Sequence, residues 1–392
     1  MTDVNRWLLP DGLEEALPAA ARRLEILRRA ILDQFDVWGY DLVIPPLAEY
    51  LESLLTGAGR ELDLQTFKLT DQMTGKLMGV RADLTPQVAR IDAHRLRDAG
   101  PSRLCYVGTV LRTRADEWSG SRSPLQAGAE LFGHDGLDSD VEIIRLMLAT
   151  LERCGVRDAS IDLGHVDIYR SLARVAGLDS SQERAFFDLL QRKAIPEIEA
   201  TLADWGLDPE VSRQLRALVE LNGGPEVLAE ARGLLADAPV QVSTAMEHLV
   251  AVIARLQESH PDLDIHVDLG ELRGYSYHTG LVFAAFVPGS GQEIARGGRY
   301  NDIGRVFGRA RAATGFSTDL RQLLRLVPDQ GEPARDCVIA PAEGDSALDA
   351  VIADLRARGV RVRRLLAGES QDATQKGRRL VKRGQEWIVE EL

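Results

Sequence analysis

Residues 271–283 read ELRGYSYHTGLVF, where an arginine, two tyrosines and a histidine surround two glycines. The apolar run that follows, GLVFAAFV, is typical of a buried strand. Polar and aromatic side chains gathered directly before such a strand indicate a binding site. Its ligand has to be inferred from the residues that accompany it along the chain.

The composition is that of an ordinary globular protein. The chain has 392 residues, of which 45% are hydrophobic and 27% charged, so we expect two domains. No apolar run reaches the roughly 18 residues of a membrane span, and the N-terminus has no leader pattern. The three cysteines show neither pairing nor metal-ligand spacing, so we expect a soluble protein of the reducing cytoplasm. A net charge of -13 argues against nucleic acid as a partner.

Hydrophobic periodicity predicts an α+β chain. We expect helices at residues 20–38, 86–98 and 139–154, and strands in YDLVIPP, LMGVRADLT, LCYVGTVLRT, LQAGAELFG, IHVDLGELRG, GLVFAAFV and EIARGGRY. A helix-rich block at about residues 168–262 interrupts these strands. After the linker VPDQGEPARD, a small α/β unit alternates strand, helix and strand, and we expect GRRLVKRG and EWIVEEL to repeat that order.

Two further groups of polar residues accompany the opening stretch. Asp83 and Thr85 share a face if VRADLTPQ is a strand, because strand side chains alternate. Arg112 on the next strand can face Gln126 and Glu130, which lie an even number of residues apart on the strand after it. Both groups have plain structural explanations, since acidic residues are common at strand ends and a buried arginine can pair with a glutamate only to stabilise the fold.

In their order and spacing these segments resemble a class II aminoacyl-tRNA synthetase, specifically histidyl-tRNA synthetase, over roughly residues 10–325. The helix, strand and proline ending at Pro46 resemble motif 1, and the Arg112 hairpin resembles motif 2. RGYSYHT and GGRYNDIG resemble the family signatures R-G-L-D-Y-Y-T and G-G-R-Y-D-G-L. The resemblance implies an antiparallel sheet flanked by helices, formed by residues 1–326 with a helical insertion at about 168–262, and a truncated domain resembling an anticodon-binding domain at 335–392.

The resemblance also implies a pocket for free histidine. Its residues would be Asp83, Thr85, Arg112, Gln126, Glu130, Arg273, Tyr277, His278 and Tyr300. Carboxylates and a glutamine would bind the α-amino group, an arginine would bind the α-carboxylate, and Glu130, Tyr277 and His278 would meet the imidazole.

The ATP-binding motifs depart from the synthetase pattern. Arg114 stands where the family has a glutamate that reads adenine, and a cation cannot accept an N–H hydrogen bond. In GFSTDLRQL, Asp319, Arg321 and Gln322 replace the second glycine, the glutamate and the arginine of G-F-x-x-G-x-E-R-L. Losing one charge-stabilising group typically costs on the order of a hundredfold in rate, so little adenylation is expected.

A retained amino-acid pocket beside a lost ATP site resembles one branch, the ATP phosphoribosyltransferase regulatory subunit family. That resemblance implies a non-catalytic, cytoplasmic subunit of histidine biosynthesis that activates the short-form catalytic subunit and mediates feedback inhibition by histidine. It implies a hetero-octamer with that partner, containing dimers of this chain, with no tRNA, membrane, metal or cofactor. Two alternatives stay open: an active synthetase or related adenylating enzyme, and an interaction protein with a vestigial pocket.

The remaining features have simpler interpretations. The other histidines show no metal-ligand spacing, so no metal is predicted. Arginines and lysines cluster between Arg356 and Arg383, where a solvated helix face is a better explanation than a nucleic-acid surface.

Overall fold

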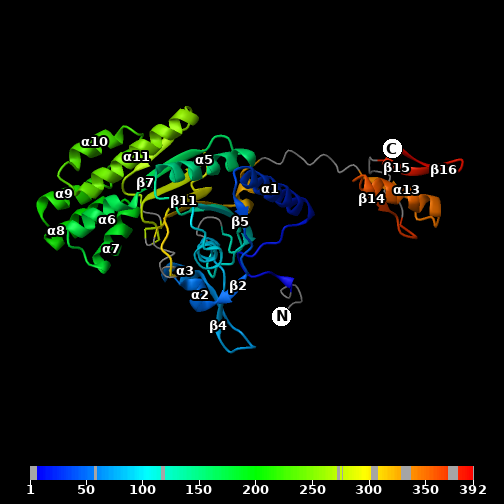
Figure 1. Ribbon diagram of the computed structural model, residues 1–392, viewed down its shortest axis with the longest axis horizontal. Helices are drawn as coiled ribbons and strands as arrows, with labels where there is room; N and C mark the ends of the chain where they lie inside the picture. Colours follow the sequence, from blue (N-terminus) through cyan, green and yellow to red (C-terminus); the bar gives the residue numbers. More distant parts are fainter. Residues whose placement is uncertain are drawn as a thin grey trace. The chain divides into compact units, whose positions relative to one another are not determined.

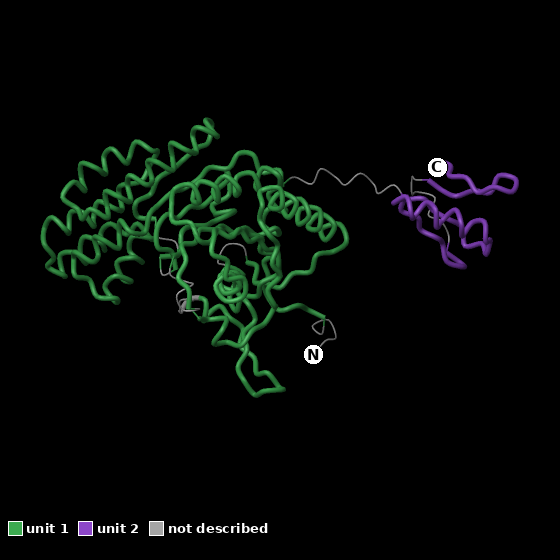
Figure 2. The backbone as a smooth tube through the Cα atoms, viewed as in Figure 1, with its two compact units in different colours: residues 1–327 green, residues 328–392 purple. Residues whose placement is uncertain are grey.

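The structure is a computed structural model that describes residues 7–56, 60–115, 120–271, 274–275, 277–301, 308–327, 337–369 and 378–391. The chain divides into two compact units, residues 1–327 and 328–392, coloured separately in Figure 2. Each unit has a hydrophobic core of its own.

A nine-stranded sheet forms the centre of the larger unit (Figure 1). In spatial order its strands are β1 (Asp41–Leu42), β5 (Ser102–Thr109), β6 (Leu125–Phe132), β12 (Ala313–Asp319), β11 (Ala295–Arg299), β10 (Leu281–Phe286), β7 (Ser160–His165), β9 (Ile265–Asp268) and β8 (Asn222–Gly223). The strands from β5 to β7 in this order pair antiparallel, as predicted. The sheet as a whole is mixed, because β1 runs parallel to β5 and β9 parallel to β7.

Helices α1 (Pro18–Val37), α5 (Leu137–Arg153) and α12 (Leu320–Leu326) pack together and against the sheet. The helix predicted at 20–38 is confirmed as α1, whose buried residues Leu24, Ile31 and Phe35 share one face. Phe35 meets Phe316 of β12 edge to face, with ring centroids 6.1 Å apart. This apolar layer fixes one side of the central strands.

A smaller antiparallel sheet, ordered β2-β4-β3, is formed by the chain between β1 and β5. The elements of this segment are β2 (Ala48–Tyr50), α2 (Leu51–Leu55), α3 (Arg60–Gln65), β3 (Phe67–Thr70), β4 (Leu77–Val80), α4 (Thr85–Arg90) and a π-helical turn (Ile91–Leu96). The prediction that Asp83 and Thr85 alternate on one strand is wrong, because β4 ends at Val80 and Thr85 begins α4. Pro86 favours that helix start, since the first turn needs no N–H from it.

The helix-rich block lies between β7 and β9. It contains α6 (Val166–Val175), α7 (Ser180–Gln191), α8 (Ile195–Trp205), α9 (Pro209–Ala217), α10 (Val227–Leu234) and α11 (Val240–Ser259). We call these six helices the insertion. Asp179 and Gln182 form a capping box that begins α7, and Asp208 caps α9 ahead of Pro209. Local sequence thus sets where these helices begin.

The smaller unit is a four-stranded sheet ordered β14-β13-β15-β16 with one helix. Its elements are β13 (Val338–Ala340), α13 (Ser346–Ala357), β14 (Val362–Arg364), β15 (Arg378–Arg383) and β16 (Glu386–Glu391). β13 runs parallel to β14 and β15. The expected repetition of strand and helix at the C-terminal end is wrong, because β15 and β16 form an antiparallel hairpin that turns through Gly384 at φ 65°.

Candidate functional site

Most of the predicted site residues line one cavity of about 210 Å³ on the central strands of the main sheet. The seven that line it are Asp83, Thr85, Arg112, Glu130, Tyr277, His278 and Tyr300. We call it the effector cavity. Gln126 does not line it but contacts a residue that does, and Arg273 lies outside the residues that the structure describes.

Glu130, on β6, is the buried acid of the effector cavity, with 1% of its surface exposed. Its carboxylate accepts hydrogen bonds from Thr85 Oγ1 at 2.8 Å, Tyr106 Oη at 3.0 Å and the hydroxyl of Tyr300. Burial raises the pKa of Glu130 to about 8, although the hydroxyl donors oppose this shift. At pH 7 this side chain is therefore mostly the neutral acid.

Glycines make room for these polar groups. Gly315 on β12 lies opposite Glu130 in the register, and a Cβ there would overlap the Glu130 carboxylate. Gly128 lies between Gln126 and Glu130 on β6, and a Cβ at this position would collide with the hydroxyl of Tyr106. The floor of the cavity thus depends on positions without side chains.

Tyr277 gives the effector cavity an unused hydrogen-bonding group. Its Oη is buried and has no hydrogen-bond partner. The ring lies 5.0 Å from that of Tyr300 and 5.4 Å from that of His278, centroid to centroid. Burial holds the pKa of Tyr277 and Tyr300 well above the usual range, so both hydroxyls stay protonated. A buried polar group without a partner is costly, which indicates that a ligand supplies one.

A further polar residue of the cavity, Asp83, comes from the turn before α4. Gln126 donates from Nε2 to Asp83 Oδ1 at 2.8 Å and accepts from the backbone of Leu84 at 3.0 Å. Arg112 lies beyond the end of β5 and donates to the carbonyl of Ala82 at 3.4 Å. It does not pair across from Gln126 or Glu130 as predicted, because the register sets Gly108 and Leu104 opposite them.

A second cavity, of about 290 Å³, shares Arg112, Glu293, Arg296 and Ser317 with the first. Asp319 and Gln322, two of the residues that depart from the synthetase pattern, line it. Asp319 Oδ1 accepts from the backbone N–H groups of Arg321 and Leu125, each at 3.0 Å, and burial raises its pKa. With Glu293, this acid sets two carboxylates beside the two arginines of the second cavity, which is less favourable for a polyphosphate than arginines alone. The exposed Arg114 lines neither cavity.

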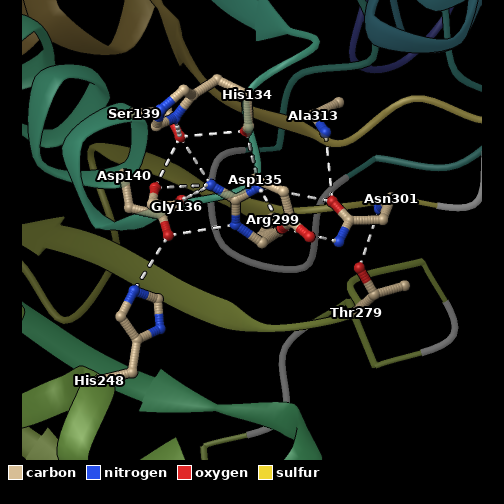
Figure 3. A network of polar contacts seen from close by, with 10 residues as sticks. All are labelled: His134, Asp135, Gly136, Ser139, Asp140, His248, Thr279, Arg299, Asn301 and Ala313. Carbon is tan, nitrogen blue, oxygen red and sulfur yellow. Dashed lines mark hydrogen bonds and ion pairs between the residues drawn. The ribbon is translucent and has the colours of Figure 1, made fainter.

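A polar network anchors Tyr300 through the neighbouring residue Arg299 (Figure 3). The buried Arg299 guanidinium binds Asp140 through two hydrogen bonds, of 2.9 and 3.1 Å, and donates to Ser139 Oγ at 2.8 Å. His248 Nε2, from α11, approaches Asp140 Oδ2 at 3.3 Å. The end of β11 is thereby tied to α5 and to the insertion, which fixes where Tyr300 enters the cavity.

Tyr106 is the functional residue that sequence reasoning missed. Its Oη hydrogen-bonds Glu130 and lies 2.9 Å from Thr85 Oγ1, so it completes the shell around the acid. The glycine between two polar residues in QAGAE was a usable signal, because it leaves space for a large side chain from the next strand.

The described residues contain no group of three or more histidine, cysteine, aspartate or glutamate side chains that could hold a metal ion. Within the same residues, no helix is long and apolar enough to cross a membrane. The basic residues of the smaller unit are largely paired: Lys382 with Asp345 at 2.7 Å, Arg383 with Glu390 at 2.7 Å, and Arg364 with Asp349.

Comparison with known proteins places the chain in a family. Residues 12–323 match the family model described as histidyl-tRNA synthetase, and residues 335–390 match that of the ATP phosphoribosyltransferase subunit HisZ C-terminal domain. An ATP phosphoribosyltransferase regulatory subunit from Thioalkalivibrio sulfidiphilus is 61% identical, over 96% of this chain and 95% of its own. The chain belongs to the ATP phosphoribosyltransferase regulatory subunit family. It is therefore a regulatory rather than a catalytic subunit.

Other members and solved structures agree with this assignment. The ATP phosphoribosyltransferase regulatory subunit of Pseudomonas putida is 55% identical over 99% of both chains. A crystal structure described as an ATP phosphoribosyltransferase regulatory subunit/histidyl-tRNA synthetase, from Bacillus halodurans, superposes with a TM-score of 0.82 at 26% identity over 94% of both chains. Histidyl-tRNA synthetase from Nostoc, with a TM-score of 0.76 at 20% identity over 94% of this chain and 87% of its own, has the same fold. The predicted synthetase-like fold is confirmed.

Proposed function

We propose that the effector cavity binds free histidine and that the chain uses this binding to regulate a short-form ATP phosphoribosyltransferase catalytic subunit. The observation that carries the proposal is the pairing of a buried, mostly neutral Glu130 with the unpartnered hydroxyl of Tyr277 in one cavity. A neutral imidazole has one N–H donor and one acceptor nitrogen, which matches two such groups. Most other amino-acid side chains do not combine an N–H donor and an acceptor nitrogen in one rigid group.

The α-amino and α-carboxylate groups of histidine would have partners in the same cavity. Asp83, oriented by the hydrogen bond from Gln126, would bind the α-amino group, and Arg112, together with the predicted Arg273, would bind the α-carboxylate. Thr85 would also orient the acid, because its hydroxyl donates to the Glu130 carboxylate. Its place near the ammonium stays a prediction.

In this proposal the chain does not adenylate histidine. The adjoining cavity carries Asp319 and Glu293 as well as Arg112 and Arg296, so its charges are mixed rather than purely cationic. The carboxylates would offset part of the attraction between the arginines and the phosphates, so we expect ATP to bind weakly beside the amino acid. The alternative of an active synthetase requires histidine-dependent exchange of pyrophosphate into ATP, at a rate comparable to that of genuine synthetases.

The proposal includes the partner and the assembly. The chain would form dimers within a cytoplasmic hetero-octamer of four regulatory and four catalytic subunits, and would activate the catalytic chain. Histidine would inhibit only if it binds the active and inhibited arrangements with different affinity, because equal binding shifts nothing. The paired charges of the smaller unit agree with a protein that does not bind tRNA.

The deciding experiment mixes the purified chain with a short-form catalytic subunit and measures phosphoribosyl transfer with and without histidine. We expect activity to rise on mixing and to fall when histidine is added. The E130Q variant should still activate but should need more histidine for the same inhibition. Failure of the wild-type chain to raise activity would refute the regulatory role. Calorimetry that stays silent at millimolar histidine would leave a vestigial cavity as the better explanation.

A further inference from the structure

The segment that forms one wall of the effector cavity is also attached to the insertion. Gly274, Tyr277 and His278 line the cavity, and Tyr275 lies between them in the sequence. We call the described residues 274–275 and 277–278 the effector loop. Arg170 of α6 donates from Nη2 to two carbonyls of this loop, Tyr275 O at 3.2 Å and His278 O at 3.1 Å.

Tyr275 makes the attachment tighter. Its ring lies under the Arg170 guanidinium, 5.0 Å from Cζ to the ring centroid, and its hydroxyl bonds the carboxylate of Glu183 in α7. Tyr169 and Phe187 pack against the same ring at 5.4 and 5.6 Å between centroids. Tyr275 therefore contacts the insertion while its neighbours line the cavity, so the loop is held from both sides.

The chain leading into the loop is held by the same part of the insertion. Gln191, the last residue of α7, donates to the carbonyl of Gly270 at 3.2 Å. Lys193, just beyond α7, pairs with Asp268 at 3.0 Å. The contacts from α6, α7 and the turn after α7 thus reach Asp268 and Gly270 as well as the effector loop.

We propose that Arg170 is a positioning residue that holds the effector loop in its cavity-forming conformation and so couples occupancy of the cavity to α6 and α7. The inference rests on the proposed binding of histidine. Coupling between two sites is reciprocal: a ligand that fixes the loop must stabilise its contacts on α6 and α7, and loosening those contacts must weaken the ligand. These two helices of the insertion then report whether the cavity is occupied.

Hydrogen exchange measured by mass spectrometry on the full chain, with and without saturating histidine, tests the coupling. In the wild type we expect histidine to slow exchange several-fold in peptides from α6 and α7, with little change in α10, which serves as an internal reference. R170Q should lose the protection of α6 and α7 and bind histidine about tenfold more weakly, since its bonds to two carbonyls are gone. A purely structural role for Arg170 would lower stability without removing a ligand-induced difference.

Two further variants keep the test decisive. R174Q changes an exposed arginine one turn later in the same helix and should behave as wild type. Y275F removes the hydroxyl that bonds Glu183 while keeping the ring and the backbone carbonyl that Arg170 contacts, and it should reduce the protection of α7 even if R170Q fails to fold.

The possible failures are distinguishable. Histidine that binds the wild type without protecting α6 and α7 overturns the coupling and leaves the proposed function standing, as does a folded R170Q with wild-type affinity. Absence of histidine binding in the wild type overturns the proposed function itself.

Discussion

The proton on Glu130 should set an upper pH limit for histidine binding, and the E130Q variant should remove that limit. In the empty cavity the pKa of Glu130 is about 8, whereas an imidazole has a pKa of about 6.5. Between these values the free protein carries the proton and free histidine does not. The complex contains one proton, shared between the Glu130 carboxyl group and the imidazole. Because the free protein already carries that proton, binding in this pH range neither takes up a proton from water nor releases one.

Above the pKa of Glu130 the situation changes. The shared proton must then be taken from water, so wild-type affinity should fall by about tenfold for each further pH unit. In E130Q the glutamine cannot lose a proton, so histidine affinity should have no upper pH limit from this position. At pH 7 the E130Q variant should bind about 10- to 100-fold more weakly, which corresponds to the loss of a hydrogen bond of about 1.5–3 kcal/mol to a charged group.

The assay is calorimetric titration of histidine into both proteins from pH 6.5 to 9. The α-amino group of the ligand titrates in both series, so dividing the Kd of E130Q by the Kd of the wild type isolates the effect of Glu130. We expect this ratio to stay constant up to about pH 8 and to be about tenfold smaller at pH 9, because deprotonation of Glu130 raises only the wild-type Kd. E293Q, which removes another carboxylate lining both cavities, is the matched control and should show no such trend. A ratio for E130Q that is flat across the whole range would refute the shared proton.

Three other variants test the cavity and the core. G315A should abolish measurable histidine binding, because its Cβ would displace the Glu130 carboxylate, whereas G291A, which has open space around the new methyl group, should bind normally. Y277F should bind histidine about tenfold more weakly in calorimetry yet unfold in urea at the same or higher concentration, since it removes a buried hydroxyl without a partner; a clear loss of stability with unchanged affinity would contradict this. Burial lowers the pKa of His165 to about 3, so the unfolded chain takes up a proton below pH 6.5 that the folded chain does not, and the free energy of unfolding should fall by up to about 1.4 kcal/mol per pH unit from this residue. H165N, which keeps a helix-capping acceptor, should show a shallower decline between pH 7.5 and 5.5 in urea unfolding, and an unchanged slope would count against the burial of a neutral ring.

Secondary structure was predicted most accurately where a segment follows a single hydrophobic period from end to end. The pattern of LQAGAELFG predicts a strand, and the even spacing of Gln126 and Glu130 predicts one side of it; the strand is confirmed as β6, which contains both residues. The resemblance predicts Asp83 and Thr85 in the site, and both line the cavity, but the strand expected to carry them is wrong. A turn in which the Asp83 side chain accepts from the Thr85 backbone cannot be told from strand alternation by residue types alone. A periodic pattern cannot show where a strand stops and a tight turn begins.

Partners that come from distant parts of the chain were harder to predict. Tyr106 reaches Glu130 only because β5 and β6 pair in one particular register. The contact of Arg170 with Tyr275 joins residues far apart in sequence, and no local pattern in either segment announces the other. Such contacts are fixed by the packing of whole elements, which a single sequence does not display.

The glycines beneath the effector cavity have one more consequence. At Gly315 and Gly128 the shape of the site is set by strands in the interior of a nine-stranded sheet rather than by side chains that can rotate away. The space that these strands leave is filled by the Glu130 carboxylate and the Tyr106 hydroxyl, so main chain that is hydrogen-bonded on both edges holds the acid in one position. Preference for a ligand that fits this position would then require no dedicated gatekeeper and would persist through many substitutions elsewhere in the protein.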